Sequence, residues 1–169
     1  MKLSFSTKGW HGYSWDELCN IAEKQGFNGI ELHNINNSSF NEKNGAFYST
    51  SAQATVRNMY EKNLRIPCID TLANPACVED REAFTKELDK CLEIACTLHI
   101  PYVRIKATDT GADYEIQKNE VISVLSAIIP KAEKLGVTII IETAGIFADT
   151  TKLLEVLNTF ACDSLAALW

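Results

Sequence analysis

The 169-residue sequence lacks long apolar runs, an excess of positive charge and recognisable phosphate-binding loops. Because no stretch of about eighteen apolar residues is present, a membrane span is not expected. The first ten residues, MKLSFSTKGW, contain no apolar core of signal-peptide length. Sixteen Lys and Arg residues against 22 Asp and Glu residues give a formal charge of −6. This acidic balance disfavours a duplex nucleic-acid partner, since phosphate binding needs a basic surface.

The six cysteines form no C-x-x-C pair and show no Cys/His spacing of a zinc module. Cys91 and Cys96 fall in one expected helix, and Cys68 falls in an expected strand. We therefore expect reduced, mostly buried thiols in a cytoplasmic protein rather than a disulfide framework. Neither G-x-G-x-x-G nor G-x-x-x-x-G-K-[ST] occurs, so no nucleotide-binding loop is indicated.

Strand-like and helix-like segments alternate along the chain. The expected strands are residues 2–6, 29–33, 66–70, 102–106, 137–142 and 164–169, and the expected helices are residues 14–26, 50–63, 79–99, 114–135 and 149–160. Ser14 and Glu17 form a capping box, and Asp149 or a nearby Thr caps the last helix. We expect a polar loop over residues 34–44 and a bend or break near Pro130. The alternation favours right-handed βαβ units and a parallel sheet in one domain, residues 1–169.

Two architectures fit this alternation, an open doubly wound sheet and part of a (β/α)8 barrel. Strand parity favours the barrel, because apolar residues on one face can pack on helices while polar residues share the other face. The polar set comprises Glu31, His33, Asp70, Arg104, Lys106 and Glu142. An unpaired buried charge would cost several kcal/mol, so these groups must be paired, metal-bound or open to a wet mouth. Barrel active sites lie at that mouth, which makes Glu142, at the end of VTIIIE, a predicted site residue.

Four segments resemble the xylose-isomerase-like TIM-barrel family, especially its sugar phosphate isomerase/epimerase branch. They are GFNGIELH (26–33), IPYVRIK (100–106), GVTIIIETAGIFADT (136–150) and LAALW (165–169). The fifth-strand glutamate followed by a sixth strand ending in Leu-Trp is the most specific part. A complete barrel has about 250 residues. The resemblance therefore implies an incomplete (β/α)8 barrel, with about six parallel strands and five intervening helical segments, truncated after strand six.

The resemblance also implies a divalent metal, Mn, Mg, Co or Zn, at the mouth of the barrel, with Glu142 as one ligand. The family's other ligands are an aspartate just after the strand-six tryptophan and a later His and Glu, which would lie beyond Trp169. We therefore expect weak or absent metal binding by this chain. Many relatives carry His or Asn soon after the strand-five glutamate, where this sequence has Thr143 and Ala144.

Glu142 is the candidate catalytic and metal-binding residue. The substrate-binding candidates are His33, Asp70, Arg104, Lys106 and Trp10. An arginine fork suits phosphate or sugar hydroxyls. Each candidate also has a structural interpretation: Glu142 can pair with Arg104 or Lys106, and Trp10 can merely cover the mouth.

The function that the resemblance implies is metal-assisted proton transfer beside a carbonyl of a sugar or sugar phosphate, which a truncated chain need not retain. One alternative is a non-catalytic barrel fragment that self-associates, because exposed edges of strands one and six predict a homo-oligomer. The other is a relative of apurinic-site endonucleases. Those relatives carry His ligands at the ends of strands three and four, where Asp70 and Lys106 stand here.

Overall fold

The computed structural model describes residues 1–169, in which six strands and six α-helices follow one another along the chain. The strands are β1 (Ser4–Ser6), β2 (Gly29–His33), β3 (Cys68–Asp70), β4 (Tyr102–Ile105), β5 (Thr138–Glu142) and β6 (Leu165–Leu168). The helices are α1 (Trp15–Gln25), α2 (Ser38–Asn41), α3 (Ala52–Glu61), α4 (Arg81–Leu98), α5 (Tyr114–Leu135) and α6 (Thr150–Phe160), with a 3-10 turn η1 (Gly145–Phe147) before α6.

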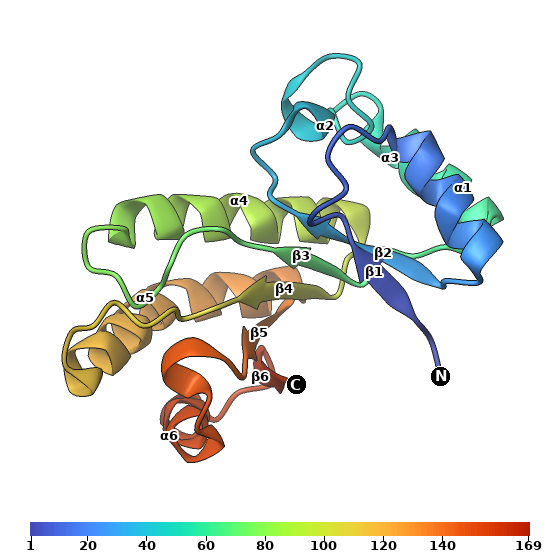
Figure 1. Cartoon of the computed structure of the whole chain (residues 1–169). Helices are drawn as coiled ribbons and strands as arrows, with labels where there is room; N and C mark the ends of the chain where they lie inside the picture. Colours follow the sequence, from blue (N-terminus) through green and yellow to red (C-terminus); the bar gives the residue numbers. More distant parts are fainter.

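The strands form one sheet in the order β1-β2-β3-β4-β5-β6, and every neighbouring pair is parallel. The sheet curves, and the helices cover its outer side while its inner side stays open (Figure 1). This arrangement confirms the predicted partial TIM barrel. None of the helices combines the length and the apolar character needed to cross a bilayer.

Local signals in the sequence account for the ends of α1. The Glu17 amide donates to the Ser14 hydroxyl, and the Ser14 amide donates to Glu17 Oε2 at 2.8 Å, which completes the predicted capping box. At the other end, Gly26 takes φ +73°, a left-handed conformation that glycine adopts with little strain. Asp149 caps α6 as predicted, because its Oδ1 accepts from the Thr151 amide at 2.9 Å.

The structure differs from two expectations about helices: the loop 34–44 contains a helix, and no break occurs at Pro130. The expected loop 34–44 contains the short helix α2, whose first amides are capped by the Asn37 side chain. All five connections between the strands are helical as predicted, and the connection from β2 to β3 contains two helices. Helix α5 continues through Pro130 without interruption. Ile128, Ile129 and Ala132 beside it are buried, and we infer that this packing outweighs the roughly 3 kcal/mol cost of an internal proline.

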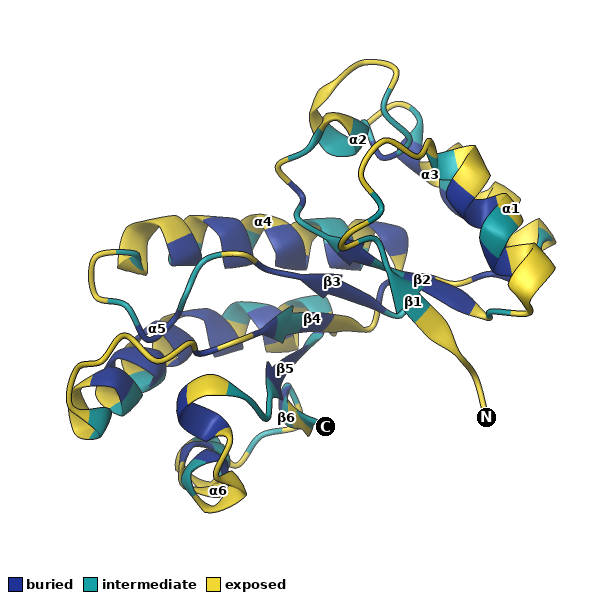
Figure 2. Ribbon diagram, viewed as in Figure 1, coloured by how far each residue is buried: buried dark blue, intermediate teal, exposed yellow.

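The hydrophobic core lies between the sheet and the helices, on the side that strand parity predicted. Buried residues line the strands and the sheet-facing sides of α4 and α5 (Figure 2). The outward strand residues Ile30, Leu32, Ile69, Val103, Ile105, Ile139 and Ile141 are each at most 2% exposed. Burying one such side chain contributes about 1.5–3 kcal/mol, so this layer fixes which strand face is left for the polar residues.

Polar side chains fix the loops at the carboxyl ends of β3 and β4. The buried Glu87 of α4 accepts hydrogen bonds from the amides of Leu72 and Ala73 at 2.8–3.1 Å. Asn74 joins this loop to the next one, because its amide group donates to the Thr108 carbonyl and its Oδ1 accepts from the Thr108 amide. The two loops are therefore held together directly above the strand ends.

Gly145 allows a close approach between the loop after β5 and the loop after β4. It has φ +59°, and a Cβ at this position would overlap the Ala107 carbonyl oxygen. The next amide, of Ile146, donates to that same oxygen at 3.0 Å. The loop that follows Glu142 is thus tied to the end of β4.

We predict that Gly145→Ala lowers the free energy of unfolding by about 2 kcal/mol or more, because left-handed strain and a backbone clash add up. Gly111→Ala is the matched control: it has φ +81° but nothing within 4 Å of its added Cβ, so only strain of about 1 kcal/mol is expected. Urea unfolding followed by circular dichroism measures both. Equal losses in the two variants would contradict the close contact.

Candidate active site

Asp70 and Arg104 form the most buried ion pair on the inner face of the sheet. Their strands are in register, with His33, Asp70 and Arg104 side by side across β2, β3 and β4. Arg104 Nε donates to Asp70 Oδ1 at 2.9 Å, and Nη2 lies 2.6 Å from Oδ2. This is a two-pronged pairing with a carboxylate that is only 4% exposed, so the position of Asp70 is fixed by the guanidinium.

Two further carboxylates surround the same guanidinium. Arg104 Nη2 lies 3.4 Å from Glu31 Oε1, and Nη1 lies 3.7 Å from Glu142 Oε2. Burial alone lowers the pKa of Arg104, but the hydrogen bond and charge of Asp70, followed by the charges of Glu31 and Glu142, raise that pKa above its ordinary value. Arg104 therefore stays cationic and holds three negative groups together.

Of the three carboxylates, Glu142 makes the longest contacts with cations. Its contacts with Arg104 and with Lys106 Nζ, at 3.7 and 3.8 Å, are ion pairs longer than hydrogen bonds. Its side chain is 27% exposed and that of Lys106 is 46% exposed. Both groups lie where β5 and β4 end, so a molecule at the mouth can reach a carboxylate and an ammonium together.

His33 ends β2 and extends the ion-pair network. Its Nδ1 lies 2.6 Å from Asp70 Oδ2, and its backbone amide donates to Thr7 Oγ1 at 2.9 Å. The side chain is 17% exposed, so one side of the ring is open while the other faces Asp70. Sequence reasoning did not name Thr7, although its position directly after β1 is the signal that places it at the mouth.

Trp10 does not join the ion pairs. Its ring packs on Phe5 and Tyr13 with centroid distances of 5.2 and 5.4 Å. It lines a hollow of about 230 Å³ whose lining also includes His33. The structure thus brings His33, Asp70, Arg104, Lys106 and Glu142 into one network and places Trp10 in the adjoining hollow.

The cysteines lie outside this network of contacts, and all six are free thiols. Cys19, Cys68 and Cys91 are buried. Burial, followed by the nearby charge of Glu31, raises the pKa of Cys68 to about 12. A thiol with such a pKa is a poor nucleophile at neutral pH, which leaves the carboxylates, the lysine and the histidine as the groups able to act chemically.

The described residues do not form a metal site by themselves. No three side chains among His, Cys, Asp and Glu converge on a point that could hold an ion. Asp70 is fully occupied by Arg104 and His33, and Glu31 faces the guanidinium. Glu142 remains a single carboxylate with free coordinating capacity.

The family model described as xylose isomerase-like TIM barrel matches residues 19–167. The chain belongs to this family. A search of curated proteins gave no match. The match covers strands β2 to β5 and most of β6, and the inner carboxylates of the sheet lie at the end where barrel enzymes place their active sites.

Solved structures share the fold at low sequence identity. A probable 3-DHS dehydratase, AsbF, involved in petrobactin synthesis from Bacillus anthracis, has a TM-score of 0.81 and 17% identity, over 99% of this chain and 62% of that one. IolI with a bound zinc atom has 0.78 and 19%, over 98% and 61%. D-psicose 3-epimerase in the presence of D-fructose has 0.77 and 12%, over 99% and 62%. The chain spans about three fifths of the length of these structures.

We predict that Arg104→Gln lowers the free energy of unfolding by about 3 kcal/mol, because it leaves Asp70 buried without its charge partner. Lys106→Gln is the matched control. It removes a neighbouring cation that is half exposed and makes one long contact, so less than about 1 kcal/mol is expected. Chemical denaturation measures both variants. Similar stability losses would mean that Arg104 does not organise the inner face.

Proposed function

We propose that this chain carries an isomerase- or epimerase-type site that moves a proton beside the carbonyl group of a sugar or sugar phosphate. One observation carries the proposal: Glu142 is a partly exposed carboxylate at the end of β5, within 4 Å of two cations, in a xylose isomerase-like fold. The likeness to D-psicose 3-epimerase supports the same class of reaction.

The chemistry needs a base and a stabilised oxygen. Removing a proton beside a carbonyl moves negative charge onto the carbonyl oxygen. Glu142 would accept that proton. The Lys106 ammonium, which lies near the same carboxylate, would stabilise the negative charge that develops on the carbonyl oxygen. Returning the proton to the neighbouring carbon, with a hydroxyl proton passing between the two oxygens, gives isomerisation. Epimerisation would instead need a second acid that delivers a proton to the opposite face of the same carbon.

The remaining candidates have supporting roles in this proposal. Arg104 holds Glu142 and Asp70 at fixed positions, and His33 and Trp10 contact the substrate from the β1–β2 side of the mouth. Glu142 is also proposed as one ligand of a divalent metal, Mn, Mg, Co or Zn, which would polarise the carbonyl when bound. The bound zinc of IolI supports a metal in a relative of this fold. With one available ligand, we expect these 169 residues to bind it weakly or not at all.

We predict that Glu142→Gln reduces proton exchange into the substrate at least a hundredfold, because the amide cannot accept the proton. The assay is deuterium incorporation from D2O beside the carbonyl of D-fructose or fructose 6-phosphate, followed by NMR. Glu133→Gln is the control, since Glu133 is exposed on α5 and should leave exchange unchanged. Exchange that survives in a folded Glu142→Gln variant, or that is absent from the unchanged protein, would refute the proposed function.

We also propose that these 169 residues self-associate through the free edges of β1 and β6. Each of these strands pairs with one neighbour only, so backbone amides and carbonyls on the other edge have no strand partner. β6, LAAL, carries no charge that would oppose pairing with a second copy.

Light scattering coupled to size exclusion tests this association at micromolar concentration. The expected result is a dimer or larger assembly, and Ala167→Lys on β6 should shift it toward monomer because charge blunts an exposed strand edge. A monodisperse monomer of the unchanged protein with a cooperative unfolding transition would exclude the proposed pairing.

A further inference from the structure

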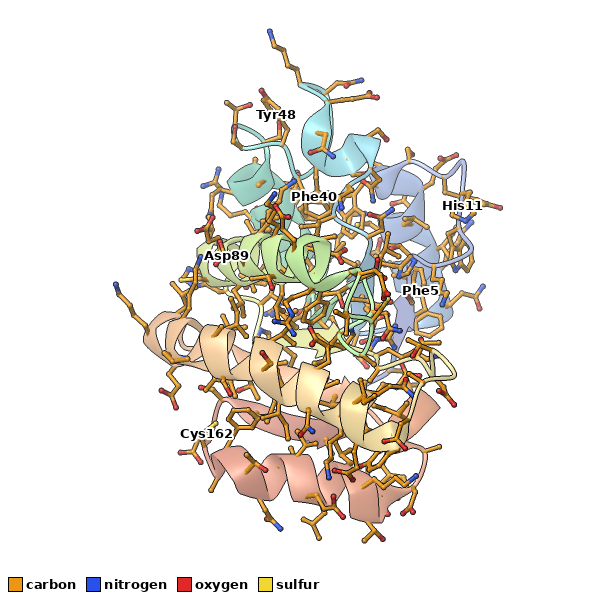
Figure 3. All side chains as sticks on the ribbon, turned by 90° about the vertical axis from the view of Figure 1, so that its left-hand side faces the viewer. Phe5, His11, Phe40, Tyr48, Asp89 and Cys162 are labelled. Carbon is orange, nitrogen blue, oxygen red and sulfur yellow. The ribbon has the colours of Figure 1, made fainter.

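A large cleft lies at the amino ends of the strands, opposite the candidate active site. It has a volume of about 830 Å³ and is lined by parts of residues 2–4, 56–67 and 98–102 and by Asn28. We call it the basal cleft. The loops after β3 and β4 lie at the left of Figure 1 and toward the viewer in Figure 3, so the basal cleft faces away from the viewer in Figure 3. Its volume falls in the range of small-molecule sites, about 300–1,000 Å³.

The basal cleft has the opposite charge to the chain as a whole. Its charged side chains are the cations Lys2 and Arg65, and no Asp or Glu lines it, although the formal charge of the chain is −6. Neither cation takes part in any ion pair of the structure. An anion that enters the cleft therefore meets positive charge without having to displace a carboxylate.

The chain holds Arg65 in place at its backbone and at its side chain. Its amide donates to the Asn28 carbonyl and its carbonyl accepts from the Ile30 amide, both at 3.0 Å. The guanidinium carbon lies 4.0 Å from the ring centre of Tyr60, and Nη1 donates to the Leu64 carbonyl at 2.8 Å. A guanidinium has five N–H donors, so the other donors of this exposed side chain are available to a ligand. Their planar fork matches a carboxylate or a phosphate.

Helices α3 and α4 end at the basal cleft, and the free carbonyl groups of a helix end would disfavour an anion. Here the last turn of each helix closes on amides of the chain itself. The Met59 carbonyl accepts from the Leu64 amide, and the Ala95 carbonyl accepts from the Ile100 amide, both at 2.8 Å. This pairing reduces the negative potential that the two helix ends would otherwise present.

Much of the remaining lining is apolar or aromatic. Pro67 and Pro101 have no amide proton, so side chains rather than these parts of the backbone must bind an anion. Tyr60 and Tyr102 are 39% and 43% exposed. A flat apolar group that covered these rings would remove apolar surface from water, which is favourable.

We propose that the basal cleft is a second ligand site, which binds a small organic anion through Arg65: a carboxylate or a phosphate attached to an aromatic body. The oxygens of the anion accept from the available guanidinium donors, Lys2 adds a second positive charge, and the aromatic body packs on Tyr102. Strand β4 begins at Tyr102 in this cleft and is followed by Lys106 at the mouth, so the two sites lie at opposite ends of one strand. The proposal does not depend on the chemistry at Glu142.

NMR titration of the 15N-labelled protein with benzoate, phenyl phosphate and the neutral benzyl alcohol tests this site. We expect the amide signals of residues 63–66 and 98–102 to shift with at least one of the two anions, and the tighter of them identifies the preferred anionic group. Benzyl alcohol should bind at least tenfold more weakly. Arg65→Gln should weaken binding of the preferred anion about ten- to a hundredfold, because hydrogen bonds to a charged group are lost.

Arg57→Gln is the matched control. Arg57 is also exposed and lies on α3, but it does not line the basal cleft, so its substitution should leave the affinity unchanged. Equal weakening by the two arginine variants, or equal binding of benzyl alcohol and the anions, would overturn the proposal.

The position of the shifts is measured on the unchanged protein, so it tests the site even if Arg65→Gln fails to fold. Shifts confined to the mouth around Lys106 and Glu142, or no shift with either anion at millimolar concentration, would also overturn the proposal. Deuterium exchange at Glu142 is a separate assay, and its failure would refute the proposed function without affecting this site.

Discussion

One guanidinium, that of Arg104, makes the inner face of this sheet possible. Three carboxylates, Asp70, Glu31 and Glu142, point to the same side of a parallel sheet, and without a cation among them their repulsion would oppose folding. Arginine suits the position because its fork binds Asp70 with two nitrogens while another prong faces Glu142. A lysine at this position would supply the positive charge but could not bind Asp70 with two nitrogens while facing Glu142.

The ion pair between Arg104 and Asp70 also determines which polar groups of the inner face are left open to a ligand. Asp70 is occupied by its contacts with Arg104 and His33. The side chains of His33, Lys106 and Glu142 remain partly exposed. Barrel enzymes carry their active sites at the carboxyl ends of the strands, and these three groups are the accessible ionisable side chains of the network there.

Strand parity alone predicted which residues face the helices and which share the inner face. Ile139 and Ile141 are buried, while Glu142 turns inward and remains partly exposed, because alternation along a strand is a local geometric property. The partner of Arg104 was not predictable in the same way. Three carboxylates could have received its fork, and the choice of Asp70 depends on the register across β3, a strand of three residues.

Polar residues in helices were the other gap between sequence and structure. Glu87 and Gln117 are polar residues of helices, and both are buried. Each satisfies backbone groups of a loop: Glu87 accepts from the amides after β3, and Gln117 accepts from the Thr110 amide. These side chains are buried because they pair with backbone amides of a loop that is distant in the sequence. The residues around them in the sequence do not show where that loop lies, so this burial could not be predicted from the local pattern. The short helix α2 escaped prediction because four residues give no periodicity.

The fixed attachment of the loop after β5 makes the mouth asymmetric. The amide of Thr143 donates to Leu168 on β6, and that of Ile146 donates to Ala107 beyond β4, so the segment carrying Glu142 is secured on both sides. The opposite wall is built from the much longer connection between β2 and α3, which holds only a four-residue helix. The wall that carries Glu142 is therefore tied to two strands by backbone hydrogen bonds, whereas the opposite wall is built mainly from an irregular connection. Exchanging residues 34–51 between relatives would change the wall opposite Glu142 and leave the backbone attachments of Glu142 untouched.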